Sequence, residues 1–181
     1  MRALSIIILC VGAAVAYGIV HAKITARICV EYFTIGHPPV FGTESPTLLG
    51  LGWGIIATWW VGLLVGVPLA VAALAGCRPK RALSSLVRPV ATLLLVMAVC
   101  AVAAGVAGYG LGQRGLVQLT EPLDSMVPAD RHARFLADLW AHSMSYLVGF
   151  VGGVVTIARV WRSRGTGVAP ERLVPSSVER P

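Results

Sequence analysis

Four long apolar stretches constrain the fold of this chain more than any other feature. They cover residues 4–22, 47–75, 89–112 and 136–160, and the first three contain no acidic or basic residue. A hydrocarbon core of about 30 Å needs roughly 20 apolar residues in a helix. Only 13% of the residues are charged and 56% are hydrophobic, whereas soluble domains carry about 25% charged residues. The sequence therefore predicts an all-α integral membrane protein, a four-helix bundle with small extracytoplasmic loops.

The chain divides into a membrane domain over residues 1–164 and a tail over residues 165–181. The tail is rich in Pro, Ser and Arg, with little to bury, and is predicted to be disordered. Proline marks two helix starts, because Ser45-Pro46 and Arg88-Pro89 place it where its missing N–H costs nothing. Pro68 lies inside the second stretch and is predicted to kink that helix rather than end it.

The basic residues predict how the chain lies across the membrane. Ten fall on one side of the four stretches and five on the other, and cytoplasmic loops carry the excess of Lys and Arg. Both termini are therefore predicted to be cytoplasmic, in a bacterial-type inner membrane. The formal net charge of +7 is explained by this bias, so nucleic acid is not an expected partner. In an alternative reading, residues 1–22 are a signal peptide cleaved after Val20-His21-Ala22.

Small residues recur every fourth position in all four stretches, which places each set along one helical ridge. Membrane helices associate through such ridges because lipid gives them no hydrophobic driving force. Packing within one chain is the favoured interpretation, and a homo-oligomer is the alternative. The four sets are Ala14, Gly18 and Ala22; Gly50, Gly54, Thr58, Gly62 and Gly66; Cys100, Ala104, Gly108 and Gly112; and Ala137, Ala141, Ser145, Gly149 and Gly153.

The first outer loop is unusually apolar. Its segment Ile28–Ile35 is rich in β-branched and aromatic residues, which predicts extended backbone. This segment is expected either to cover the outer mouth of the bundle or to lie in the membrane interface. Two prolines follow His37 and stiffen the turn that carries it. His37 is therefore a candidate ligand at a fixed place, or simply a turn histidine at the membrane surface.

The fourth stretch carries the most informative polar pattern. Asp138, His142 and Tyr146 recur every fourth residue and share one helix face. Ionisable groups inside a span are costly and tend to face the bundle interior. A carboxylate and an imidazole one turn apart can bind a divalent metal or act as a proton-linked pair, and the alternative is a purely structural pair.

These residues lead to a metal-site hypothesis on the outer face. Imidazole and carboxylate ligands suit zinc, iron or copper, so the expected cofactor is a divalent transition metal. A haem held by His21 and His142 is a further alternative. The candidate metal ligands are His142, Asp138, His37, Glu31 and His132.

The sequence does not define an activity. It contains no HExxH, no zinc-finger spacing, no phosphate-binding glycine loop and no nucleophile elbow, so an enzyme is not favoured. A transporter is disfavoured because charges are missing from the middle of the spans. Two functions remain: a membrane protein whose outer polar cap binds a metal or small ligand, and a structural or assembly subunit that binds another membrane protein.

Overall fold

The computed structural model describes residues 1–164, so the predicted tail lies outside the described residues. Every regular element within residues 1–164 is helical, and no strand occurs among them. The elements are α1 (Arg2–Ile28), α2 (Glu31–Thr34), α3 (Pro46–Ile56), α4 (Trp59–Leu74), α5 (Ser84–Gln113), α6 (Leu123–Met126), the 3-10 helix η1 (Ala129–Arg131) and α7 (His132–Ser163).

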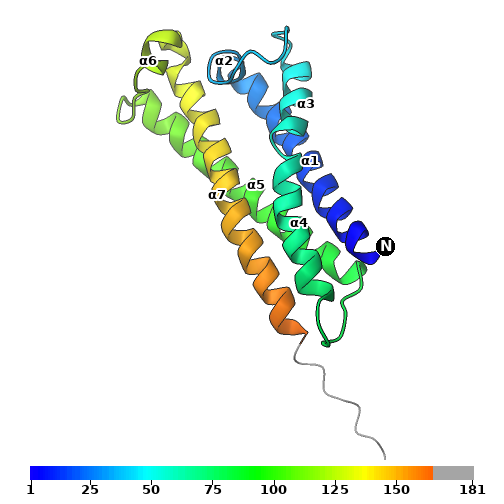
Figure 1. The fold of residues 1–181 in the computed structure, drawn as a ribbon. Coiled ribbons are helices and arrows are strands. Elements are labelled where there is room, and N and C mark those ends of the chain that lie inside the picture. The colour runs from blue at the N-terminus through cyan, green and yellow to red at the C-terminus, as the bar shows by residue number, and fades with distance from the viewer. Residues whose placement is uncertain (165–181) are drawn as a thin grey trace, which may run out of the picture.

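Four helical segments in the described chain are long and apolar enough to cross a membrane: Arg2–Ile28, Pro46–Leu74, Ser84–Gln113 and Ala129–Ser163. They form two pairs. Helix α1 packs along α3 and α4, whereas α5 packs along α7, and the pairs meet mainly through α4 against α7 (Figure 1). The prediction of an all-helical chain with four helices able to span a membrane is confirmed.

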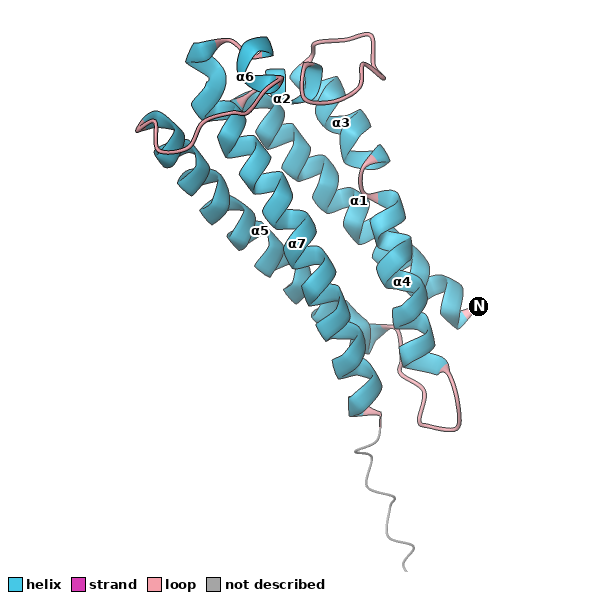
Figure 2. Cartoon of the chain, turned by 60° about the vertical axis from the view of Figure 1, so that its left-hand side comes forward, coloured by secondary structure: helices cyan, strands magenta, loops and turns pink. Residues whose placement is uncertain are grey.

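Loops and short helices connect the long helices at the two ends of the bundle (Figure 2), and these ends differ in chemistry. One end, called the histidine end, contains α2, α6 and the loops at residues 29–45 and 114–131, together with all six acidic residues of the described chain. The other, called the arginine end, contains the start of α1, the loop at residues 75–83 and the end of α7. A separate cluster of buried apolar residues closes each end, centred on Phe135 at the histidine end and on Leu69 at the arginine end.

The helices extend beyond the apolar stretches. Helix α1 continues through Lys23 and Arg27 to Ile28, because these long side chains reach the membrane interface from a helical backbone. Helix α5 begins at Ser84, five residues before Pro89, so the predicted start at Arg88-Pro89 is wrong. Ser45 and Pro46 do begin α3, although the Ser45 hydroxyl makes no capping hydrogen bond.

The second span is interrupted at Ala57-Thr58, a break that the sequence reasoning did not predict. The Thr58 hydroxyl donates to the Gly54 carbonyl oxygen, the acceptor that the Thr58 backbone N–H would use in a continuous helix. That N–H bonds to Ile55 instead, at 3.2 Å. Helix α4 then runs through Pro68 without ending, as expected.

The small-residue ridges pack within the chain. A Cβ atom built on Gly62 would lie 2.6 Å from the Cα of Val11, and one built on Gly50 would lie 2.7 Å from the Cα of Lys23. Across the other pair, a Cβ on Gly108 would lie 2.7 Å from the carbonyl oxygen of Leu136. Backbone lies against backbone at all three places, which only glycine permits.

The predicted extended segment in the first loop is wrong. Residues 31–34 form the one-turn helix α2, in which Thr34 and Ile35 donate to the carbonyls of Val30 and Glu31 at 3.1 and 2.8 Å. Its Tyr32 and Phe33 are buried in the apolar cluster at the histidine end. The strand-like composition therefore reflects burial of large side chains, which a helical turn satisfies equally well.

Candidate functional site

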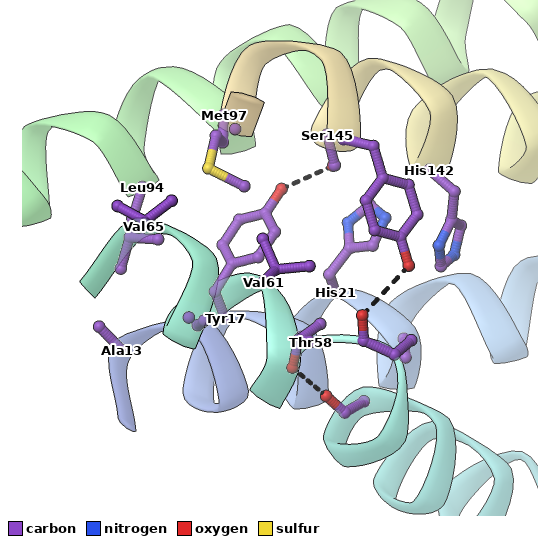
Figure 3. A pocket seen from close by; sticks show the side chains of 18 of the residues that line it. Ala13, Tyr17, His21, Thr58, Val61, Val65, Leu94, Met97, His142 and Ser145 are labelled. Carbon is purple, nitrogen blue, oxygen red and sulfur yellow. Dashed lines mark hydrogen bonds between the residues drawn. The ribbon is translucent and has the colours of Figure 1, made fainter. Parts of the chain in front are cut away.

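An internal cavity of about 110 Å³ lies between the two helix pairs (Figure 3). Its wall is apolar toward the arginine end, where Cys10, Leu69 and Val90 line it. Toward the histidine end the lining becomes aromatic and polar. The polar and aromatic lining residues of this part are Tyr17, His21, Tyr32, Phe33, His37, Trp53, Thr58, His142, Ser145 and Tyr146.

Aromatic rings form a continuous cluster along this wall. His142 of α7 contacts His21 of α1 edge to face, with ring centroids 4.4 Å apart, and stacks on Tyr32 of α2 at 4.7 Å. Tyr32 in turn meets His37 at 4.9 Å, and His37 meets Trp53 of α3 at 4.6 Å. The cluster therefore joins three of the long helical segments and the first loop through flat, rigid side chains.

The protonation pattern of His142 follows from its partner. The Thr25 hydroxyl lies within donating distance of the His21 and Ala22 carbonyl oxygens, at 3.1 and 3.3 Å. When it donates to one of these carbonyls, it accepts from Nε2 of His142, which lies 3.0 Å away. In the neutral imidazole ring, Nδ1 is then the hydrogen-bond acceptor.

His37 shows the same arrangement. Its Nδ1 donates to the Tyr32 carbonyl oxygen at 2.8 Å, since a carbonyl can only accept. Nε2 of the neutral ring is then an acceptor. The cavity thus has two imidazole rings whose second nitrogen is free to receive a hydrogen bond or to ligate a metal, while the first is held by the protein.

Hydroxyl groups fasten the helices around the cavity. Tyr17 Oη and Ser145 Oγ are 2.8 Å apart, which links α1 to α7. The Tyr146 hydroxyl donates to the carbonyl oxygen of Ala57 at 3.4 Å, which links α7 to the break in the second span. The break therefore supplies a carbonyl that a continuous helix would have used internally.

The structure separates the five predicted ligands. Only His142 and His37 line the cavity. Glu31 is held by Arg131, with Oε1 at 3.6 Å from Nε, and accepts from the Cys29 thiol at 3.3 Å. His132 donates to the Val127 carbonyl oxygen at 2.8 Å and lies 3.6 Å from Asp124.

Asp138 is fully buried outside the cavity lining. Neither carboxylate oxygen has a hydrogen-bond partner within residues 1–164. The backbone N–H of Cys29 lies beside it but donates to the Thr25 carbonyl oxygen at 3.0 Å. Residues 1–164 contain no group of three or more His, Cys, Asp or Glu side chains arranged to hold a metal ion. The metal site therefore stays a prediction, with two of its five ligands at the cavity.

Two groups near the cavity have altered acidity because they are buried. Burial, together with the hydrogen bond to Glu31, raises the pKa of the Cys29 thiol to about 12. Burial likewise raises the pKa of the Tyr32 hydroxyl above its ordinary value of 10.0. Both groups are therefore neutral hydrogen-bond donors at physiological pH.

Sequence reasoning missed Tyr17, Thr25 and Tyr32 as members of the site. A signal for the first two was available: Tyr17, His21 and Thr25 recur every fourth residue, as Asp138, His142 and Tyr146 do. Two such polar rows on apolar helices predict facing surfaces. The haem alternative is not supported by the geometry, because the rings of His21 and His142 contact each other directly.

Comparisons with known protein families, curated proteins and solved structures find no match for this chain. The proposals below therefore rest on the geometry of the site.

Proposed function

We propose that this chain is a multi-pass protein of a bacterial-type inner membrane that binds a lipid-soluble molecule in the cavity. The arginine end faces the cytoplasm and the histidine end faces outward. The ligand has a hydroxyl-bearing ring as its head and a hydrocarbon tail. One observation carries the proposal: a cavity with two imidazole acceptors adjoins an apolar groove on the outside of the bundle.

The head group is inferred from the size and lining of the cavity. Its volume of about 110 Å³ is of the same order as the ~150 Å³ engineered cavity that binds benzene. Aromatic walls favour a planar ring, which packs face or edge against them. The acceptor nitrogens of His142 and His37 call for donors on that ring, and hydroxyl groups supply them.

One ring nitrogen of His21 supports a polar ligand at the same wall. Its Nε2 is buried and has no hydrogen-bond partner within residues 1–164. Leaving such an atom unpaired costs about 1–3 kcal/mol, so native proteins seldom tolerate it without a function. A hydroxylated ring in the cavity places a donor and acceptor beside this imidazole.

The tail is inferred from the groove between α4 and α7. The groove is almost entirely apolar, and its rim includes the exposed side chains of Trp60, Leu64 and Phe150. It shares Val61, Val65, Tyr146 and Gly149 with the cavity lining. A molecule dissolved in the bilayer therefore has a lateral route to the polar wall without crossing water.

The test uses decylhydroquinone and its O,O-dimethyl analogue, which keeps the ring and the tail but carries methoxy groups in place of the hydroxyl donors. Binding to the purified, delipidated protein is followed by thermal stability against ligand concentration. We expect saturable stabilisation by the hydroquinone, and affinity at least tenfold weaker for the dimethyl analogue or for His142→Ala. His132→Ala is the matched control, because His132 lies outside the cavity and should leave binding unchanged.

Equal affinity for the two compounds would show that the imidazole acceptors do not recognise the ligand, and would overturn the proposal. The same purified protein is analysed for bound metals, since two imidazole nitrogens also suit a transition metal. If the wild-type protein contains a stoichiometric metal and the His142→Ala variant does not, the ligand of the site is the predicted metal and not an organic molecule. Loss of fold is checked by the melting temperature of each unliganded variant.

A further inference from the structure

A second groove lies at the opposite end of the bundle, between α5 and α7. Its volume is about 490 Å³; it shares Leu93 and Thr156 with the lining of the cavity, but none of the histidines or aromatic residues at the histidine end. The part nearest the loop is basic, with Arg81, Arg88 and Arg159 in its wall. The part toward the membrane interior is apolar, with Val96, Val148, Gly152 and Val155.

The charge of this groove is not balanced by the described chain. All acidic residues within residues 1–164 lie at the histidine end, and each recorded ion pair is there. Arg88 and Arg159 are exposed, while Arg81 is half-buried and anchored by a 3.0 Å hydrogen bond to the Ser163 carbonyl oxygen. Helix α5 also begins beside the groove, at Ser84, so its positive dipole end adds to the field.

The groove runs in the direction that a lipid takes in a bilayer. Eight residues separate Arg88 from Val96, which corresponds to about 12 Å along a helix. One leaflet of a ~30 Å hydrocarbon core is about 15 Å deep. A phosphate at the level of Arg88 would therefore place an acyl chain of the same lipid beside Val96.

We propose that this groove binds an anionic phospholipid of the phosphatidylglycerol type. Its phosphodiester contacts the guanidinium groups of Arg81, Arg88 and Arg159, and one acyl chain lies along Val96, Val148 and Val155. Guanidinium forks match phosphate oxygens in geometry and in charge. A choline headgroup cancels the phosphate charge with a cation that the arginines repel, so the site selects the anionic lipid.

The test is native mass spectrometry of the full-length protein in a neutral detergent, with equal amounts of phosphatidylglycerol and phosphatidylcholine of identical acyl chains. We expect the wild-type protein to retain phosphatidylglycerol at least fivefold over phosphatidylcholine. The double variant Arg88→Gln/Arg159→Gln should lose this preference. The matched control Arg114→Gln/Arg134→Gln removes the same charge from two exposed residues at the histidine end, and should keep it.

Two results would overturn the proposal. Equal loss of preference in both double variants would mean that net charge, rather than this groove, selects the lipid. Displacement of the lipid by the same concentration of soluble glycerophosphoglycerol would mean that the site recognises a free phosphodiester. The substituted arginines of the groove variant are exposed, so its unliganded melting temperature should match that of the control and exclude a folding defect.

Discussion

Arg164 is 2% exposed, yet its guanidinium group has no carboxylate partner within residues 1–164. It donates instead to four backbone carbonyl oxygens, those of Ala72, Ala75, Arg78 and Pro79, at 2.7–2.9 Å. Ala72 belongs to the last turn of α4 and Ala75 directly follows the helix, where carbonyls lack partners in the helix; Arg78 and Pro79 belong to the loop. One side chain at the end of α7 therefore closes the arginine end of the bundle.

Replacing Arg164 by Lys should lower the free energy of unfolding in detergent by about 3 kcal/mol. The charge remains, but an ammonium group cannot reach four carbonyls, and each buried carbonyl left unpaired costs about 1–3 kcal/mol. Arg162→Lys is the control, because Arg162 is exposed. Stability of Arg164→Lys equal to that of the wild type would show that the carbonyl contacts do not anchor this end.

The Cys29 thiol gives a pH-dependent prediction. Alkylation requires the thiolate, and burial has moved the pKa from 9.0 to about 12. The rate of reaction with N-ethylmaleimide at Cys29 should therefore be slow and still rising at about pH 11, where an ordinary thiol has already reached its plateau. Exposed Cys77 is the internal reference, and peptide mass spectrometry reads both sites. A plateau near pH 9 at Cys29 would contradict the buried, hydrogen-bonded thiol.

At the scale of the elements, α1 and the second span pack closely because glycines lie at their interface. Gly62→Leu should lower the free energy of unfolding by about 1–3 kcal/mol, because its Cβ would meet the Val11 backbone, which cannot turn away. Gly12→Leu on α1 is the matched control, since nothing lies within 4 Å of a Cβ there. Both variants are compared by thermal unfolding in detergent. Equal melting temperatures would argue against a packed interface at Gly62.

The helices and their packing faces were accessible from the sequence, because hydropathy and four-residue spacing are local properties. The break at Ala57-Thr58 was not, because it depends on a threonine hydroxyl taking the Gly54 carbonyl. At residues 28–35 the composition led to a wrong prediction of extended backbone, because a helical turn buries these apolar side chains equally well. Local patterns predict elements, whereas their interruptions depend on contacts that form only in the folded chain.

The site was predictable in part for the same reason. The row of Asp138, His142 and Tyr146 follows from helix periodicity, and His142 does reach the cavity. His37 arrives there from a loop, through stacking on Phe33 and contact with Trp53. Glu31 and His132 are engaged by neighbours that the sequence could not identify, namely Arg131 and the Val127 carbonyl.

At the scale of the whole molecule, polar chemistry is divided between the two ends. The arginine end carries eight basic residues of the described chain and the histidine end five. The eight are Arg2, Arg78, Lys80, Arg81, Arg88, Arg159, Arg162 and Arg164. Such an excess is typical of cytoplasmic loops, so it predicts one orientation for the whole bundle, with the histidine end on the outer side.

Cysteine labelling tests this orientation. Cys77 is exposed in the loop at the arginine end, and Gln118 is exposed in a loop at the histidine end. A membrane-impermeant maleimide added to intact cells should label Gln118→Cys in a Cys77→Ser background and leave Cys77 of the wild type unlabelled. Opening the cells should make Cys77 reactive, because it then meets the reagent from the cytoplasmic side. Labelling of Cys77 in intact cells would show that the bundle has the opposite orientation. A ligand at the histidine end would then enter from the cytoplasmic leaflet.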